Sequence, residues 1–334
     1  MNAEKRSVTS RILETRGMPQ VITVTAGLFV IFAVFSMLGD NFLSARNMRN
    51  LMRQAAPILI VGIAQSFVLI TGNIDLSIGS VLGMSCMTSA TLMTKGVSPL
   101  ASVGITVFLC LLIGLLNGQL VAKCSLPPFI ATLGTMTIAR GIAQIVNNNR
   151  NTDSIGEGAR AFRSLFYYGD FGGVYSPVWI AAALWLVFNF ILSSTRTGRH
   201  IYAVGSNIDA ARMSGVNINY TVTSAYLVSA FCSCVAGLVT CAAGGIGAMD
   251  AGNMYELYAV AASVIGGVST LGGQGLLLGT VVGALIWSVL QNGLILAGAP
   301  VAIRNIAVGI IVVISVLLDI VVRSGKRIRP KKTT

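Results

Sequence analysis

Long apolar runs, separated by short polar breaks, constrain the fold of this chain more than any other feature of its sequence. About ten such runs occur, at roughly residues 20–38, 55–71, 79–94, 100–122, 128–147, 177–194, 219–242, 255–267, 275–296 and 304–322. Most are long enough to cross about 30 Å of hydrocarbon, which takes roughly 20 helical residues. They are continuously apolar, whereas the strands of a membrane β-barrel alternate between apolar and polar residues. We therefore predict an all-α, polytopic transmembrane helical bundle.

The composition also argues against a soluble domain. Of the 334 residues, 54% are apolar and only 10% are charged, whereas a soluble domain carries about 25% charged residues. The polar segment 1–19 leads into an apolar stretch that is longer than the core of a cleavable signal, so we interpret this stretch as the first span. The breaks are too short to form domains, so we expect residues 1–334 to form one transmembrane domain.

Two of the runs, 79–94 and 255–267, are shorter than the others. Three arrangements fit such short runs: a tilted helix, a re-entrant segment, or a span that breaks within the bilayer beside other parts of the protein. The sequence alone leaves these arrangements open.

Glycines recur at every fourth position in two of the runs. Gly114 and Gly118 do so in the fourth run, and Gly275, Gly279 and Gly283 in the ninth. Small residues at this spacing share one helix face and let two backbones approach closely. We expect these glycines to serve helix packing.

Lys and Arg residues indicate the orientation of the bundle. An even number of spans places both termini on one side, and cytoplasmic segments carry an excess of basic residues. With both termini inside, most of the 23 basic residues are cytoplasmic, including those of the N-terminal segment 1–19, the break 195–218 and the basic tail 323–334. Three arginines, Arg46, Arg49 and Arg53, count against this orientation. The break 148–176 is then external.

The sequence lacks the residues of most enzymatic and metal sites. His200 is the only histidine, no CxxC pair occurs among the six cysteines, and no phosphate-binding loop is present. We expect no catalytic residue, no metal site and no cofactor in this chain. The spans also carry no ladder of acidic residues or histidines, which an ion-coupled carrier would use. A pathway built from hydroxyl, amide and backbone groups suits a small neutral solute, and energy for active transport would come from a partner ATPase.

The break 195–218 contains a short helix with signals at both ends. Ser206 or Asn207 can cap its N-terminus, Asp209 suits the first turn, and Gly215 suits the end. A rigid helix outside the membrane is what a motor subunit needs in order to push on a bundle, and the small side chains of Ala210 and Ala211 would fit a groove of that partner. An ordinary capped loop helix is the alternative.

Four segments of the chain form a recognisable set of motifs: Ile70–Gly79, Pro128–Met136 continuing to Gly141, Tyr255–Leu257 with Gly266–Ser269 and Gly272–Gly275, and the capped helix. They resemble motifs of the permease subunits of ribose/galactoside-type ABC importers, and the resemblance spans about residues 40–322. In this resemblance the capped helix is the coupling segment, with these contact residues: Ser206, Asn207, Asp209, Ala210, Ala211, Arg212, Ser214 and Gly215. Two positions depart from the family pattern, Asn73 where many relatives have Gly and Tyr258 where they often have Asp.

The resemblance implies a complex in the bacterial inner membrane that imports a ribose- or galactose-class monosaccharide or a similar polyol. It implies a second permease copy or a paralogous permease, a cytoplasmic ATP-binding cassette subunit that holds ATP and Mg, and a periplasmic or lipoprotein sugar-binding protein. Contacts with membrane lipid are expected, and none with nucleic acid. The rival interpretations are an ion-coupled secondary carrier and a passive channel for a small polar solute.

Four residues are candidates for the solute pathway or its gates. They are Asn73, Asp75, Ser77 and Glu256. Charged residues inside membrane spans often mark function. Asp75 and Ser77 also stand where they could cap the third span, and Glu256 where it could complement the dipole of the eighth, so structural roles are the alternative.

Arg46, Arg49 and Arg53 lie before the second span at positions i, i+3 and i+7. This spacing places them on one side of a short amphipathic segment. We expect them to dock acidic residues of the binding protein, with a lipid-interface role as the alternative.

Overall fold

The computed structural model describes residues 18–39 and 41–327 and is helical almost throughout this part of the chain. The helices are α2 (Met18–Leu38), α3 (Ala45–Ile70), α4 (Ile78–Thr94), α5 (Pro99–Ala122), α6 (Pro128–Val146), η1 (Glu157–Ala159), α7 (Arg160–Arg163), η2 (Ser164–Tyr168), α8 (Ser176–Ser194), α9 (Arg196–Ser206), α10 (Ile208–Met213), α11 (Ile218–Gly244), α12 (Tyr255–Ile265), α13 (Leu277–Leu296) and α14 (Val301–Arg327). Two short strands, β1 (Asp170–Phe171) and β2 (Val174–Tyr175), form a hairpin in which Asp170 pairs with Tyr175.

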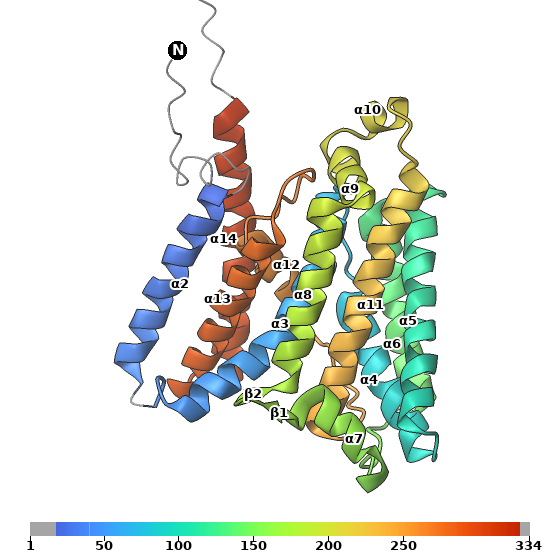
Figure 1. Cartoon of the computed structure of the whole chain (residues 1–334), viewed down its shortest axis with the longest axis vertical. Coiled ribbons are helices and arrows are strands. Elements are labelled where there is room, and N and C mark those ends of the chain that lie inside the picture. The colour runs from blue at the N-terminus through green and yellow to red at the C-terminus, as the bar shows by residue number, and fades with distance from the viewer. Residues whose placement is uncertain (1–17, 40, 328–334) are drawn as a thin grey trace, which may run out of the picture.

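The predicted spans are all present as helices. Within the described residues, seven helices are long and apolar enough to cross a membrane, and three shorter apolar helical segments are α4, α12 and Val301–Leu317 of α14. The start of α2, the end of α14 and helix α10 lie at one end of the bundle, here called the α10 side (Figure 1). The hairpin and α7 lie at the other end, the hairpin side. The start of the first span, the end of the last span and the break 195–218 thus lie at the opposite end of the bundle from the break 148–176, as the predicted topology requires.

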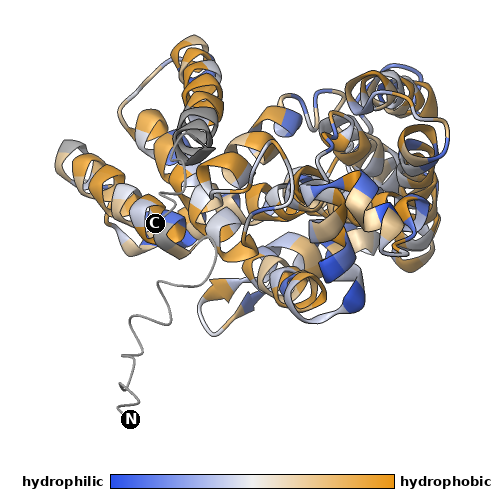
Figure 2. Cartoon of the chain, turned by 90° about the horizontal axis from the view of Figure 1, so that it is seen from above, coloured by the Kyte–Doolittle hydropathy of each residue, from blue (hydrophilic) through white to orange (hydrophobic). Residues whose placement is uncertain are grey.

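Helices α3 and α11 occupy the centre of the bundle. Both are mostly buried, whereas α2, α5, α6 and α8 bury about a tenth to a third of their apolar windows. The outer helices expose many large apolar side chains, as expected for surfaces that face lipid. Hydrophobic residues predominate along the helices (Figure 2). Close contact between α5 and α11 depends on Gly114, because a Cβ atom there would lie 2.6 Å from the Cβ of Ala230. The predicted packing role of this glycine is confirmed.

The two short spans are broken helices. Before α4 the chain runs through the non-helical residues 71–77, and before α12 through residues 245–254. The N-termini of α4 and α12 meet, since a Cβ atom at Gly79 would clash with the Gly252 carbonyl oxygen and the Glu256 carboxylate. Irregular backbone at membrane depth is tolerated only where protein or a water-filled cavity surrounds it. Both segments of irregular backbone pack beside other parts of the chain, an arrangement that fits the third of the possibilities left open by the sequence.

Three boundaries differ from the sequence prediction. Helix α3 begins at Ala45, ahead of its apolar run, because the Ser44 hydroxyl caps it by accepting the amide of Asn47 at 3.2 Å. Helix α13 begins at Leu277, so Gly275, with φ of +145°, precedes the helix and does not share a face with Gly279. Helix α14 continues to Arg327, into the predicted tail 323–334. Residues 1–17 and 328–334 of the two predicted terminal segments lie outside the described residues.

Candidate functional site

The break 195–218 folds into two helices, α9 and α10, which together form an arm outside the bundle (Figure 1). Asn207 caps α10, since its Oδ1 accepts the amide of Ala210 at 2.9 Å. Gly215 ends the turn with φ of +80°, a conformation that costs glycine little. The capped helix predicted from the sequence is confirmed, with Asn207 as the cap and Ser206 as the last residue of α9.

One face of α10 is buried and the rest is open to solvent. Ala211 is only 4% exposed and belongs to a buried apolar cluster with Val68, Val204, Val222 and Tyr226, which we call the arm cluster. The expectation that Ala211 faces a partner is therefore wrong, because its methyl group packs into its own chain. Ala210 is exposed. The exposed apolar side chains are those of Met213, 91% exposed, and Ile208, 44% exposed, and neither was predicted as a contact.

The charged residues of α10 add little to its stability. Asp209 and Arg212 form an ion pair of 3.5 Å, but their side chains are 80% and 66% exposed. Exposed pairs of this kind contribute roughly 0–1 kcal/mol. Asp209 lies in the first turn and Arg212 in the last, where each complements the helix dipole. Both side chains therefore remain available to a partner.

The arm is held against the end of α3. A Cβ atom at Gly205 would clash with the carbonyl oxygen of Ile70, so the two backbones are in direct contact. The same carbonyl accepts the amide of Gly273 at 2.8 Å. The hydroxyl of Tyr202 donates to the Gly275 carbonyl at 2.7 Å, and burial raises the pKa of Tyr202 to about 12. A displacement of the arm must therefore move the end of α3 or break these contacts.

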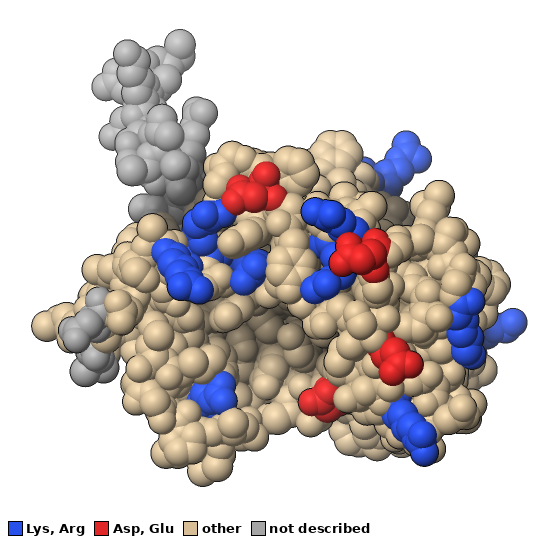
Figure 3. Space-filling view, turned by 90° about the horizontal axis from the view of Figure 1, so that it is seen from below, with Lys and Arg blue, Asp and Glu red and all other residues tan. Residues whose placement is uncertain are grey.

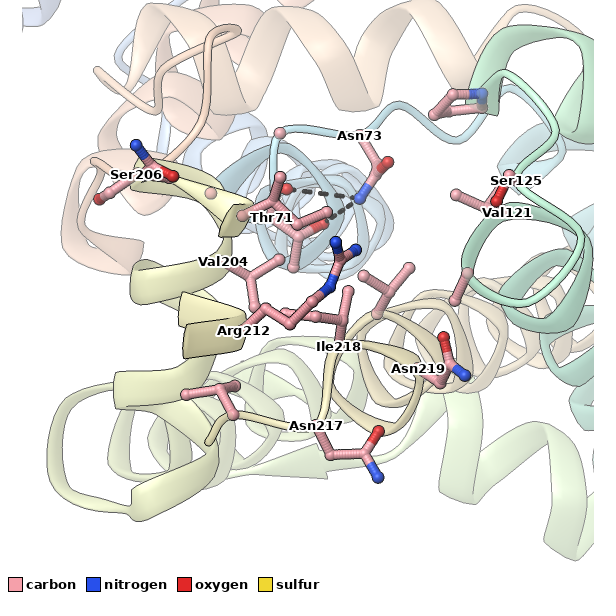
Figure 4. Close-up of a pocket in the computed structure, with 18 of the residues that line it drawn as sticks. Thr71, Asn73, Val121, Ser125, Val204, Ser206, Arg212, Asn217, Ile218 and Asn219 are labelled. Atoms are coloured by element: carbon pink, nitrogen blue, oxygen red, sulfur yellow. Dashed lines mark hydrogen bonds between the residues drawn. The ribbon is translucent and has the colours of Figure 1, made fainter. Parts of the chain in front are cut away.

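A polar pocket of about 870 Å³ lies beside the arm and is partly lined by it. Figure 4 shows its walls, which come from residues 71–73, the turn between α5 and α6, the arm, and the start of α11. Its polar lining consists of Thr71, Asn73, Ser125, Ser206, Asn207, Arg212, Asn217 and Asn219. The Asn73 amide donates to the Thr71 hydroxyl at 2.8 Å. The structure thus brings one pathway candidate, Asn73, next to the predicted coupling residues.

Asp75 and Ser77 lie deeper, where the broken span enters α4. Asp75 is 2% exposed, and its Oδ1 accepts the Ser77 amide at 2.8 Å and the Ser77 hydroxyl at 2.6 Å. Its Oδ2 accepts the hydroxyl of Ser229 on α11 at 2.7 Å. All three partners are donors, as an acceptor-only carboxylate requires. Asp75 therefore orders the turn before α4 and connects it to α11. The predicted capping differs, because Ser77 is the N-cap residue of α4 and no side chain makes a capping hydrogen bond there.

The remaining pathway candidate, Glu256, lies apart from Asn73 and the arm. It occupies the first turn of α12, next to Gly79 at the junction of the two broken helices. Arg140 on α6 is bound nearby, since its Nη1 donates to the Ala251 carbonyl at 2.8 Å. The position of Glu256 fits the predicted interaction with the helix dipole.

On the hairpin side, the three arginines proposed for docking differ in their surroundings. Arg49 forms an ion pair with Asp170 and lies over the ring of Tyr175, 4.7 Å from its centroid. Arg53 lies over Tyr175 at 4.4 Å and over Tyr167 at 4.6 Å. All three arginines belong to α3. Arg49 and Arg53 bind residues of their own chain, whereas the side chain of Arg46 is exposed. Basic and acidic side chains surround a hollow on this side (Figure 3).

No cluster of three or more potential metal ligands occurs in residues 18–39 and 41–327. Among the described residues, five cysteines are buried and Cys124 is exposed, and all six are free thiols.

The comparisons with known proteins decide the family. The family described as "Branched-chain amino acid transport system / permease component" matches residues 47–316. The chain belongs to this permease family. The ribose import permease RbsC of Haemophilus influenzae is 35% identical, over 87% of this permease and 90% of that protein. RbsC of Bacillus subtilis is 33% identical, over 96% and 98% of the two chains.

The xylose transport system permease XylH of Escherichia coli is 31% identical, over 90% of this permease and 91% of that protein. No solved structure matched the chain. The permease is thus a multi-pass membrane protein and a component of a transport system, in agreement with its apolar helices.

Sequence reasoning missed several polar residues of this permease that join its helices. Tyr226, Asn117, Thr135 and Ser229 are buried and hydrogen-bonded between elements. Polar side chains within apolar runs are the available signal for them, because such groups need partners when they are removed from water. Which residues they bind depends on the tertiary structure.

Proposed function

We propose that this permease imports a small neutral sugar of the ribose class across the bacterial inner membrane, as part of an ATP-binding cassette importer. Relatives named for ribose, allose and xylose import support this class of solute. The pocket is lined mostly by neutral hydroxyl and amide groups, beside the cation of Arg212, and such groups suit a hydroxylated solute. A galactose-class sugar or a similar polyol fits the same chemistry.

The proposal that the ATPase acts on this permease rests on the structure of α10. It is capped at both ends and anchored to α3, and it exposes Met213 and Ile208 outside the bundle. Exposed apolar side chains on a rigid element favour a protein contact. We assign this surface to the partner ATPase, with Ser206, Asn207, Asp209, Ala210, Arg212, Ser214 and Gly215 at or around the contact.

The ATPase would hold the ATP and Mg, and this chain would contribute no catalytic residue and no cofactor. A sugar-binding protein would deliver the solute to the hairpin side, and a second permease copy or a paralogue would complete the pathway. Asn73, with Asp75, Ser77 and Glu256, remains the candidate set for its gates. The α10 side is then cytoplasmic, which agrees with the distribution of Lys and Arg.

Reconstitution in liposomes tests this proposal. The permease, its ATPase and its binding protein should take up radiolabelled D-ribose, D-allose or D-xylose only when ATP is present on the ATPase side. The matched control is the permease alone in the same liposomes. Uptake by the permease alone without ATP would favour the rival functions, a secondary carrier or a channel.

A further inference from the structure

We propose that Tyr226 and the hydrogen-bonded groups around Asp75 transmit movement of α10 to the broken span before α4. This inference rests on the proposed contact between α10 and an ATPase. It adds the route by which that contact reaches the interior of the bundle, and it assigns positioning roles to Tyr226, Asp75, Ser229, Asn117 and Thr135.

The first part of the route is the arm cluster. Ala211 of α10 and Tyr226 of α11 are both buried in it, at 4% and 0% exposure, together with Val204 of α9. Close-packed side chains transmit displacement because few voids absorb it. A shift of α10 therefore acts on the ring of Tyr226.

The second part is a single hydrogen bond. The Tyr226 hydroxyl donates to the carbonyl oxygen of Ile74 at 3.1 Å. Ile74 lies in the non-helical segment 71–77 and directly precedes Asp75. Tyr226 thus contacts the arm cluster through its ring and the broken span through its hydroxyl.

The third part is a chain of hydrogen bonds that continues to α6. The Ser77 hydroxyl, which donates to Asp75, accepts the amide of Asn117 on α5 at 2.9 Å. The Oδ1 of Asn117 accepts the hydroxyl of Thr135 on α6 at 2.6 Å. Each group donates toward the carboxylate, and successive bonds of this kind strengthen one another. One buried carboxylate thereby connects α4, α5, α6 and α11.

The segment 71–77 is suited to change its conformation. It lacks regular helical hydrogen bonds, and Gly72 at its start has φ of +80°. Residues 71–73 line the polar pocket together with the arm, so α10 has open space on that side. Because buried polar groups are costly to leave unpaired, the chain around Asp75 favours discrete arrangements over gradual stretching.

The alternative is that these contacts only stabilise the fold. The transmitting role and the purely stabilising role predict different values of one quantity, the number of sugar molecules taken up per ATP hydrolysed by the reconstituted complex. Loss of stability lowers sugar uptake and ATP hydrolysis together, whereas loss of transmission lowers sugar uptake and leaves ATP hydrolysis unchanged. The variants Tyr226→Phe and Ser229→Ala each remove one hydroxyl and keep the shape of the side chain.

We expect Tyr226→Phe to lower the ratio of uptake to hydrolysis about five-fold, within the range for mutations that alter coupling. Ser229→Ala should lower it by a smaller factor. The matched controls are Ser233→Ala and Thr137→Val, whose hydroxyls bond only to a backbone carbonyl of their own helix. An unchanged ratio in Tyr226→Phe, or an equal fall in Ser233→Ala, would overturn the proposal.

A second measurement does not depend on the solute. In the complex of permease and ATPase, nucleotide binding should change the hydrogen exchange of the amides in residues 71–77 as well as in α10. Tyr226→Phe should abolish the change in 71–77 and keep the change in α10. If both changes persist in this variant, the proposed route is wrong, whatever the result of the sugar-uptake experiment.

Discussion

The two ends of the molecule both carry residues that look suited to bind a partner, and they differ in how those residues are used. On the α10 side, the most buried residue of α10 is Ala211, and the exposed side chains include Met213 and Ile208. On the hairpin side, Arg49 and Arg53 are already bound by an aspartate and two tyrosines of their own chain. A residue of suitable type therefore indicates a docking surface only when its side chain is not already bound by residues of its own chain.

The largest effect should come from the exposed apolar residues of α10. The double variant Ile208→Asp/Met213→Asp should reduce ATPase copurification and ATP-driven uptake at least about ten-fold, since a few central apolar residues commonly carry 2 kcal/mol or more of an interface. Membrane insertion and thermal stability should stay near the parent level.

The matched control for this variant lies at the opposite end. Leu165→Asp changes an apolar side chain on the hairpin side whose exposure, 59%, lies between those of Ile208 and Met213, and it should leave ATPase copurification unchanged. If Leu165→Asp reduced copurification as strongly as the α10 variant, the contrast between the two ends would fail.

A comparison of neighbouring alanines sharpens the contrast within α10. Ala211→Trp should overpack the arm cluster and destabilise the permease by about 1–3 kcal/mol. Ala210→Trp changes an exposed position, so it should leave the melting temperature unchanged and weaken ATPase binding. Thermal unfolding and copurification, measured on both variants, check this prediction, and equal melting temperatures would contradict the buried position of Ala211.

On the hairpin side, Arg53 should matter for stability. Arg53→Gln removes the cation from between Tyr167 and Tyr175 and should destabilise the permease by about 1–2 kcal/mol. Arg53→Lys is the matched variant, because it keeps the charge and loses the planar stacking group. In thermal unfolding, Arg53→Lys should have a melting temperature between those of Arg53→Gln and the parent. A parent-like melting temperature for Arg53→Gln would exclude the stacking role.

The smallest effect should be that of Arg46, the exposed member of the three. Arg46→Glu should lower the association rate of the binding protein a few-fold at low salt, and the difference should shrink as salt is raised, because rim charges act mainly through steering. Stopped-flow or surface-binding kinetics measure this. A rate that does not change with Arg46→Glu at any salt concentration would favour the lipid-interface role instead.

Much of the fold could be predicted from the sequence because hydrocarbon imposes a length on each apolar run, and the order of ten helices followed from that rule. The caps of α10 were also predictable, since Asn207 and Gly215 act on their immediate neighbours. The inward position of Ala211 could not be predicted, because it depends on Val68 and Tyr226, which come from other parts of the chain. The bonds of Arg49 to Asp170 and Tyr175 likewise join residues far apart in sequence.

The broken span before α4 has a consequence for how the protein is made. Helix α4 is buried along nearly its whole length and carries several hydroxyl groups, among them Ser80, Ser85 and Ser89. A nascent chain emerging from the insertion machinery presents this segment before α11 has been synthesised, so Asp75 then lacks Ser229 as a partner. Lipid alone provides no substitute for that hydroxyl. We therefore expect helix α4 to reach its final position late in biogenesis, after Ser229 of α11 has entered the membrane.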